Sequence, residues 1–157
     1  MSAALFVVTL VIGIAVVLAL IAVPFIVVFR RRYLSAGERL NSELELEGTL
    51  IPPSKGVYRG ATAVGYPAVK NNGWMALTRR RVAFLTLTGK TIEIPLDTVI
   101  GFGEARVFKA SVAGGWTHLV IRTAAGEIGF FTSDNAAWLA ALREVTGLTP
   151  DASADSR

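Results

Sequence analysis

The chain has 157 residues, of which 52% are hydrophobic, and a formal net charge of +4. It contains no cysteine, which excludes disulfide bonds, thiolate catalysis and cysteine-ligated metal sites. A modest net positive charge of this kind is compatible with binding to an anionic lipid surface at least as well as to nucleic acid.

Residues 1–32 are predicted to form a single transmembrane α-helix. The run from Ala3 to Phe29 contains no charged residue. As a helix rising about 1.5 Å per residue it would span roughly 40 Å, more than the ~30 Å hydrocarbon core of a membrane requires. A cleaved signal peptide is the competing interpretation, but it would need a basic start and a much shorter apolar core.

The charges that flank this run predict its direction. Three arginines follow it at once, whereas no Lys or Arg precedes it. Because Lys and Arg stay on the cytoplasmic side, the N-terminus is expected outside and the C-terminal domain in the cytoplasm, at the inner membrane. The residues expected at the membrane interface are Arg30, Arg31, Arg32 and Tyr33.

Residues 33–55 are expected to connect the helix to a folded domain. The segment Leu44 to Glu47 alternates like an edge strand, whereas Glu38 and Arg39 suit a short helix, so the structure of the connector stays open. Pro52 and Pro53 within it indicate a turn or loop.

Residues 56–147 carry the pattern of a mainly β domain. Short segments rich in β-branched and aromatic residues alternate with turn signals such as Asn71-Asn72-Gly73 and Thr88-Gly89-Lys90. A strand every ~8 to 12 residues is typical of a small barrel or sandwich.

The spacing of apolar residues changes to that of a helix near the C-terminus of this domain. Ser133 or Asp134 can cap a helix, and apolar residues follow at helical spacing until Gly147 and Pro150 stop it. One C-terminal α-helix is therefore expected to cap the β domain, followed by a small, polar, disordered tail over residues 148–157.

Three segments resemble the pleckstrin-homology and GRAM superfold, including its bacterial PH-like members. Leu77 to Leu85 is similar to the "leucine, threonine, basic, then apolar strand" of those domains, and Ile94 to Val99 is similar to their "I-P-L-x-x-I/V" step. Gly126 to Phe131, with the helix bearing Trp138, resembles their last strand and capping helix. The resemblance implies a PH-like domain over residues 56–147 and is nearly silent on its ligand.

His118 is the only histidine, so a catalytic triad or a metal site would have to be built around it. No motif links it to a nucleophile, and the glycines at 101 and 103 lack the third glycine of a dinucleotide fingerprint, where Arg106 stands. We therefore expect no enzyme, catalytic residue, cofactor, metal, nucleic acid or small-molecule substrate. A hydrolase or transferase using His118 is the less favoured alternative.

Basic residues are the candidates for holding an anion or lipid headgroup. In PH domains that bind phosphoinositides, basic residues of the first strands and their connecting loop hold the phosphates. The resemblance implies this role for Lys55, Arg59 and Lys70, and strand alternation places Arg79 and Arg81 on one face. A solvated strand face is the alternative interpretation.

The aromatic residues outnumber what one side of a small core needs, so one of them is expected to be exposed, which suggests a protein interface. Partial burial in the core is the default interpretation. The candidates for a partner surface are Phe102, Phe108 and Trp116. The resulting hypothesis is a membrane-anchored PH-like interaction module, acting as a scaffold or accessory subunit that docks a protein partner. Anionic-lipid headgroup binding through the basic residues is the alternative, with the lipid bilayer as a further expected partner.

Overall fold

The computed structural model describes residues 3–112 and 114–151, without the side chains of 3–10, 15, 25, 28–30, 32–34, 36 and 112. The chain divides into two compact units, Met1–Ser35 and Ala36–Arg157.

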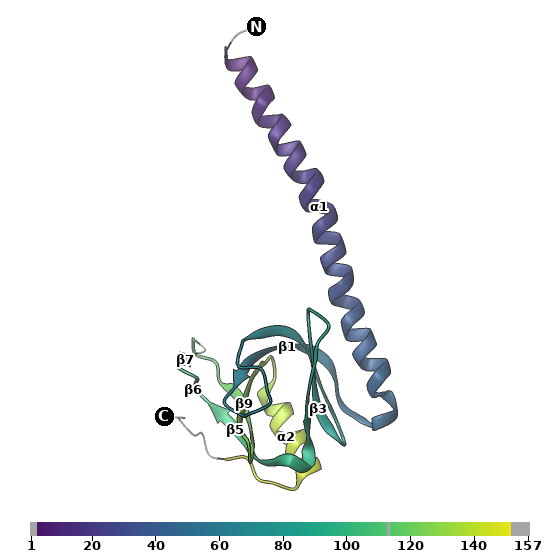
Figure 1. The fold of residues 1–157 in the computed structure, drawn as a ribbon, viewed down its shortest axis with the longest axis vertical. Helices are drawn as coiled ribbons and strands as arrows, with labels where there is room; N and C mark the ends of the chain where they lie inside the picture. Colours follow the sequence, from purple (N-terminus) through teal and green to yellow (C-terminus); the bar gives the residue numbers. More distant parts are fainter. Residues whose placement is uncertain (1–2, 113, 152–157) are drawn as a thin grey trace. The chain divides into compact units, whose positions relative to one another are not determined.

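Helix α1 (Ala3–Leu44) runs without a break past the three arginines and into the segment expected to be a connector (Figure 1). Within the described residues, no helix combines the length and the apolar character that crossing a membrane requires. This finding overturns the transmembrane anchor predicted over residues 1–32, its orientation and the inner-membrane localisation. The prediction treated the apolar run as a self-contained segment, whereas it begins a 42-residue helix that continues into a polar stretch.

Of the four residues expected at the membrane interface, only Arg31 has a side chain that the structure describes. Arg31 is exposed, whereas the side chains of Arg30, Arg32 and Tyr33 lie outside the described residues.

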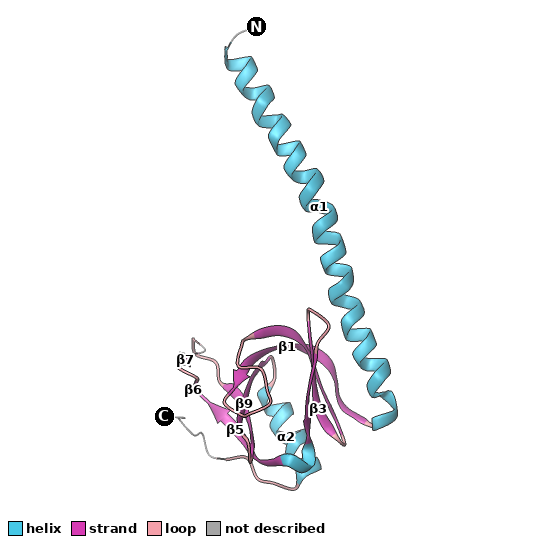
Figure 2. Cartoon of the chain, in the orientation of Figure 1, coloured by secondary structure: helices cyan, strands magenta, loops and turns pink. Residues whose placement is uncertain are grey.

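The unit from Ala36 onward is mainly β (Figure 2). Seven antiparallel strands form one sheet in the order β4-β3-β2-β1-β9-β8-β5. Their bounds are β1 (Thr49–Ala61), β2 (Asn71–Thr78), β3 (Arg81–Thr86), β4 (Thr91–Pro95), β5 (Val99–Ala105), β8 (His118–Thr123) and β9 (Gly126–Thr132).

Besides the sheet and the end of α1, this unit contains four shorter elements and a C-terminal helix. The strands β6 (Val107–Phe108) and β7 (Ser111–Val112) form a separate hairpin, and two 3-10 turns, η1 (Glu45–Glu47) and η2 (Leu96–Thr98), lie before β1 and β5. Helix α2 (Asn135–Thr146) follows the last strand; Asp134 caps its first turn by accepting the Ala137 N–H at 2.9 Å.

The long strand β1 joins the two halves of the sheet, because it pairs with β2 along its first part and with β9 along its last. Its register shifts at three places, and Figure 1 shows its curved path. One of these shifts, between Tyr58 and Gly60, leaves Arg59 as the extra residue of a bulge.

One face of the sheet packs on the core together with α2. The buried rings of Tyr58, Phe84 and Phe130 lie at centroid distances of 5.5 to 6.0 Å, and Trp138 and Leu142 of α2 are buried in the same cluster. Tilted and edge-on ring pairs at such distances are favourable.

The opposite face, called the outer face below, is covered in two places. Over β2 and β3, Leu40 and Leu44 from the end of α1 are buried against Ala76 and Ala83. Over β8 and β9, the cover is the β6–β7 hairpin, whose Phe108 is buried with Val120. Because side chains alternate along a strand, His118 and Val120 face this hairpin while Leu119 and Ile121 face the core.

Candidate interaction surface

The β6–β7 hairpin is fixed to the sheet by one aromatic ring in a glycine notch. Phe108 is 1% exposed, and a Cβ added at Gly129 of β9 would come within 2.4 Å of its ring. No side chain fits at position 129 while Phe108 occupies this position.

Polar contacts anchor the turn of the same hairpin and the residue that follows it. The Lys109 ammonium donates to the carbonyls of Ala61 and Ala68, at 3.2 and 2.8 Å. Arg59 donates from Nη2 to the Ser111 hydroxyl oxygen, so the bulge in β1 directs this guanidinium to the hairpin.

The hairpin turn is made by residues that disfavour it. Lys109 and Ala110 have φ values of 51° and 58°. A two-residue turn with positive φ at both positions is normally built from Asn and Gly, because a Cβ is crowded there. The contacts of Phe108, Lys109 and Ser111 therefore hold a turn whose own residues do not favour it.

His118 lies beneath the hairpin and is fully buried. Its Nε2 lies 3.2 Å from the Ser111 carbonyl, which can only accept, so the neutral ring carries its proton on Nε2. Phe108 and Phe131 lie beside it at centroid distances of 6.3 and 6.4 Å. Among the described residues, Nδ1 has no hydrogen-bond partner.

Burial lowers the pKa of His118 below its ordinary value of 6.5, and the nearby charge of Arg59 lowers it further, against the opposing effect of the Ser111 carbonyl. The imidazole is thus kept neutral and enclosed, and its hydrogen-bond partner is a backbone carbonyl. This is a structural setting, since no reacting group of a substrate could reach the ring without displacing the hairpin.

Trp116 is the large exposed aromatic of this region, at 62% exposure. Its ring stands edge-on to Phe131, at a centroid distance of 5.9 Å and an angle of 64°. Phe131 is half-buried and pairs directly with Val57 of β1. The surface formed by Trp116, Phe131 and Val57 is called the Trp116 surface below.

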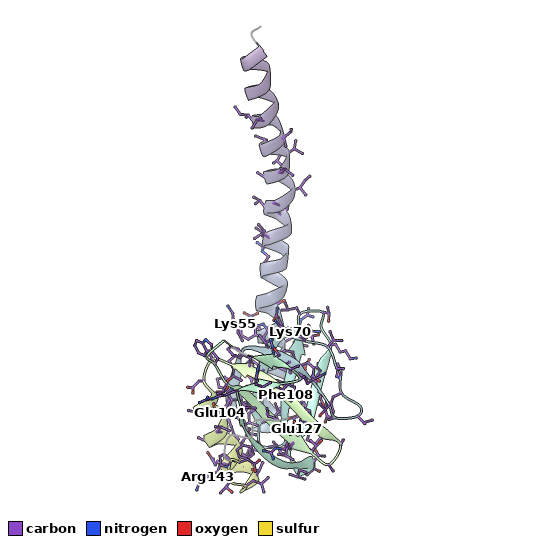
Figure 3. The ribbon with its side chains drawn as sticks, turned by 90° about the vertical axis from the view of Figure 1, so that its left-hand side faces the viewer. Lys55, Lys70, Glu104, Phe108, Glu127 and Arg143 are labelled. Carbon is purple, nitrogen blue, oxygen red and sulfur yellow. The ribbon has the colours of Figure 1, made fainter. Side chains whose placement is uncertain are left out.

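Three of the five predicted cations lie on β1 or directly before β2, near this surface. Along β1, Lys55 lies two residues before Val57 and Arg59 lies two residues after it. Lys70 directly precedes Asn71, which pairs with Tyr58. Lys55 and Lys70 are exposed, and in Figure 3 both lie at the end of the domain opposite Arg143. Arg59 is half-buried because it contacts Ser111.

The other two predicted cations lie elsewhere, at the β2–β3 connection. Arg81 donates to both carboxylate oxygens of Glu47, at 3.0 and 2.7 Å, and also forms an ion pair with Glu93. Arg79 is exposed in the turn, beside Gly48. The predicted alternation does not apply to the arginine triplet, because β2 ends at Thr78 and β3 begins at Arg81.

Of the three predicted partner-surface residues, only Trp116 is exposed. Phe102 belongs to the core, and Phe108 is the ring that the hairpin buries against the sheet. The sequence interpretation did not select Lys109 or Phe131; the adjacency of Phe130 and Phe131 in a strand was the available signal, because one of the two must face outward.

Two open hollows lie apart from the Trp116 surface. One, of about 420 Å³, is lined by Tyr66, Lys90 and Glu93 among others, and the other, of about 610 Å³, by Arg79, Arg80 and Asp97 among others. Both mix cations with a carboxylate. In the residues that the structure describes, no group of three His, Asp or Glu side chains is placed to hold a metal ion.

The fold and surface define the unit from Ala36 onward as a mainly antiparallel β domain with a C-terminal helix and an exposed aromatic beside basic side chains. No protein-family model matches the sequence, and no curated protein matches it. One solved structure, the C-terminal domain of an unknown protein from Leishmania infantum, is similar over 71% of this chain and 97% of its own, at 12% identity and a TM-score of 0.48.

Proposed function

We propose that this chain is a non-enzymatic interaction module of PH-like architecture that docks a protein partner, as a scaffold or accessory subunit, through the Trp116 surface. The architecture supports the resemblance drawn from the sequence, because seven sheet strands are followed by one helix whose Trp138 is buried in the core. Fold alone carries no function, so the proposal depends on the surface.

The observation that carries the proposal is the exposure of Trp116 in a fixed setting. An indole that is 62% exposed keeps most of its apolar area in contact with water. Its edge-on contact with Phe131 and the anchored hairpin beside it limit the entropy that would be lost on binding. Rigid, exposed tryptophans are the residues that most often dominate the free energy of protein association.

The charges around this surface define the partner. Lys55 and Lys70 are exposed and Arg59 is half-buried near Val57. A partner segment with an apolar side chain flanked by carboxylates is complementary to such a surface, and the charges would speed its association at low salt.

Anionic-headgroup binding has less support, because Arg59 and Arg81, both among the predicted cations, have partners within the domain. Arg81 is bound to Glu47 and Glu93, and Arg59 donates to Ser111. The enzyme alternative is weakened by the enclosure of His118.

Comparative affinity purification tests the proposal. The full chain, Trp116→Ala and the matched control Val64→Ala, whose side chain is 83% exposed on another loop, would each be purified from cells under identical conditions. We expect a stoichiometric protein that wild type and Val64→Ala retain and Trp116→Ala loses. The same proteins recovered at the same level with all three chains would contradict the proposal, and binding to phosphate-bearing vesicles that Lys55→Glu with Lys70→Glu abolishes would favour the headgroup alternative.

A further inference from the structure

The free edge of β5 is partly occupied by the chain itself. The sheet order ends at β5, so this strand presents backbone groups that no neighbouring sheet strand satisfies. The structure records a parallel bridge between Gly103 and Asp151, and the Asp151 N–H donates to the Phe102 carbonyl at 2.8 Å. Asp151, which follows α2 by only a few positions, is thus hydrogen-bonded to the edge strand β5.

Two glycines of β5 make room for this residue. A Cβ at Gly101 would lie 2.9 Å from the Asp151 carboxylate, and a Cβ at Gly103 would lie 2.9 Å from the Asp151 backbone oxygen. Neither glycine has a positive φ, so backbone conformation does not call for glycine at either position. What the two glycines provide is space for a chain that approaches the edge closely.

A cation on the neighbouring strand binds the side chain of the occupant. Arg122 of β8, which pairs with Gly101, forms an ion pair from Nη2 to the Asp151 carboxylate at 2.5 Å. Its Nε lies farther, at 3.9 Å, from Glu127. Arg122 is therefore directed mainly at the residue on the edge, and a charged guanidinium favours a carboxylate there.

As far as the structure describes the chain, the internal contact reaches only a small part of the β5 edge. A single residue pairs with the strand in the described chain, although β5 extends from Val99 to Ala105. The Arg122 and Asp151 side chains are 30% and 39% exposed, so the ion pair is partly screened by water. A longer extended segment could add further main-chain hydrogen bonds along β5 while keeping the same ion pair.

We propose that the edge of β5 binds an extended segment of a protein partner with an aspartate in the position of Asp151, and that Asp151 competes with it from within the chain. The recognition elements are the backbone of Phe102 and Gly103, the space at Gly101 and Gly103, and the Arg122 guanidinium. This site uses none of the residues of the Trp116 surface.

The test uses the full chain and a fluorescein-labelled synthetic peptide that copies residues 147–154, Gly-Leu-Thr-Pro-Asp-Ala-Ser-Ala. Its dissociation constant is measured by fluorescence anisotropy. If the internal contact leaves the edge open about a tenth of the time, Asp151→Ala binds the peptide about tenfold more tightly than wild type. A peptide with Ala in place of Asp should bind Asp151→Ala at least tenfold more weakly than the Asp peptide.

Variants of the edge separate recognition from folding. Adding Arg122→Met to Asp151→Ala should abolish the preference for the Asp peptide, whereas adding the matched control Arg106→Met, which removes an exposed guanidinium just beyond β5, should leave it unchanged. Trp116→Ala should also leave peptide binding unchanged, which distinguishes failure at this edge from failure at the Trp116 surface.

Three results would overturn the proposal. The first is equal affinity of wild type and Asp151→Ala for the peptide, and the second is equal affinity of Asp151→Ala for the Asp and Ala peptides. The third is concentration-dependent self-association of the wild-type chain that Arg122→Met removes, because the edge would then belong to a second copy.

Discussion

The two covers of the outer face are built from opposite kinds of contact. The end of α1 covers β2 and β3 with Leu40 and Leu44, which are buried against two alanines. The β6–β7 hairpin covers β8 and β9 with one buried ring, Phe108. Its hydrogen bonds run from its own Lys109 to backbone carbonyls and from Arg59 and His118 to its Ser111.

We therefore expect the hairpin cover, and not the helical cover, to depend on pH. An apolar contact depends on the area removed from water and not on protonation. The hairpin contact depends on a buried imidazole that must stay neutral, on two cations and on a turn with unfavourable φ values. The Trp116 surface lies beside the responsive cover, since Phe131 contacts both Trp116 and His118.

The largest effect on stability is expected from removing the Phe108 ring, which holds the hairpin cover. Phe108→Ala removes a fully buried aromatic from the notch above Gly129 and should lower the free energy of unfolding by about 3–5 kcal/mol. Urea denaturation followed by tryptophan fluorescence measures it, with the exposed Val69→Ala as control. A loss under about 1 kcal/mol would mean that the ring does not hold the hairpin.

The matching change at the other cover is Leu44→Ala. It should lower the free energy of unfolding by about 2–4 kcal/mol, because a fully buried side chain leaves a cavity over Ala76 and Ala83. Leu46→Ala, two residues along and 98% exposed, is the control and should change little. The loss of free energy of unfolding caused by Leu44→Ala should be the same at pH 7.5 and pH 5.5. A loss that changes with pH would contradict the proposed difference between the two covers.

The hairpin cover should weaken in acid. The pKa of His118 is lower in the folded chain than its ordinary 6.5, so above about pH 6.5 the ring is neutral in both states and its contribution to stability is complete. Below that pH the unfolded chain takes up the proton first. Stability should then fall as pH decreases toward the folded pKa, by up to about 1.4 kcal/mol per pH unit.

His118→Gln removes this titration while leaving an N–H near the Ser111 carbonyl. The free energy of unfolding of wild type and His118→Gln, measured from pH 7.5 to pH 5, should diverge in slope below pH 6.5. Parallel curves would show that the imidazole does not control the cover.

The smallest effect on stability is expected from a change in the hairpin turn. Ala110→Gly should raise the free energy of unfolding by about 0.5–1 kcal/mol, because glycine accepts a φ of 58° without crowding. Ala124→Gly, in the exposed β8–β9 turn where φ is not positive, is the control and should have no stabilising effect. Thermal unfolding of the three chains measures both, and equal shifts in Tm would contradict the assignment of strain to Ala110.

The sequence periodicity indicates much of the β domain. Of the fold-class prediction, the mainly β part agrees with the structure, whereas the transmembrane helix is overturned. The capped C-terminal helix could be predicted because Asp134, Trp138, Leu142 and Gly147 stand at the spacing that a helix needs. The PH-like assignment itself stays a prediction.

The β6–β7 hairpin could not be predicted, since its turn residues Lys109 and Ala110 carry none of the usual turn chemistry. For the same reason Phe108 looked available for a partner, because the sequence does not show that its hairpin packs on β8 and β9 and buries the ring against Val120. The ion pairs of Arg81 join it to residues 34 and 12 positions away, Glu47 and Glu93, and depend on tertiary structure.

Whether Trp116 lies in a protein interface is tested most directly by site-specific photo-crosslinking in cells. A benzophenone amino acid replaces Trp116 in one full-length chain and Val64 in a second, and crosslinked products are identified by mass spectrometry after irradiation. The proposed interface predicts one dominant protein adduct from position 116 that is absent from position 64. Irradiation that yields no adduct at position 116, or the same adducts at both positions, would contradict it.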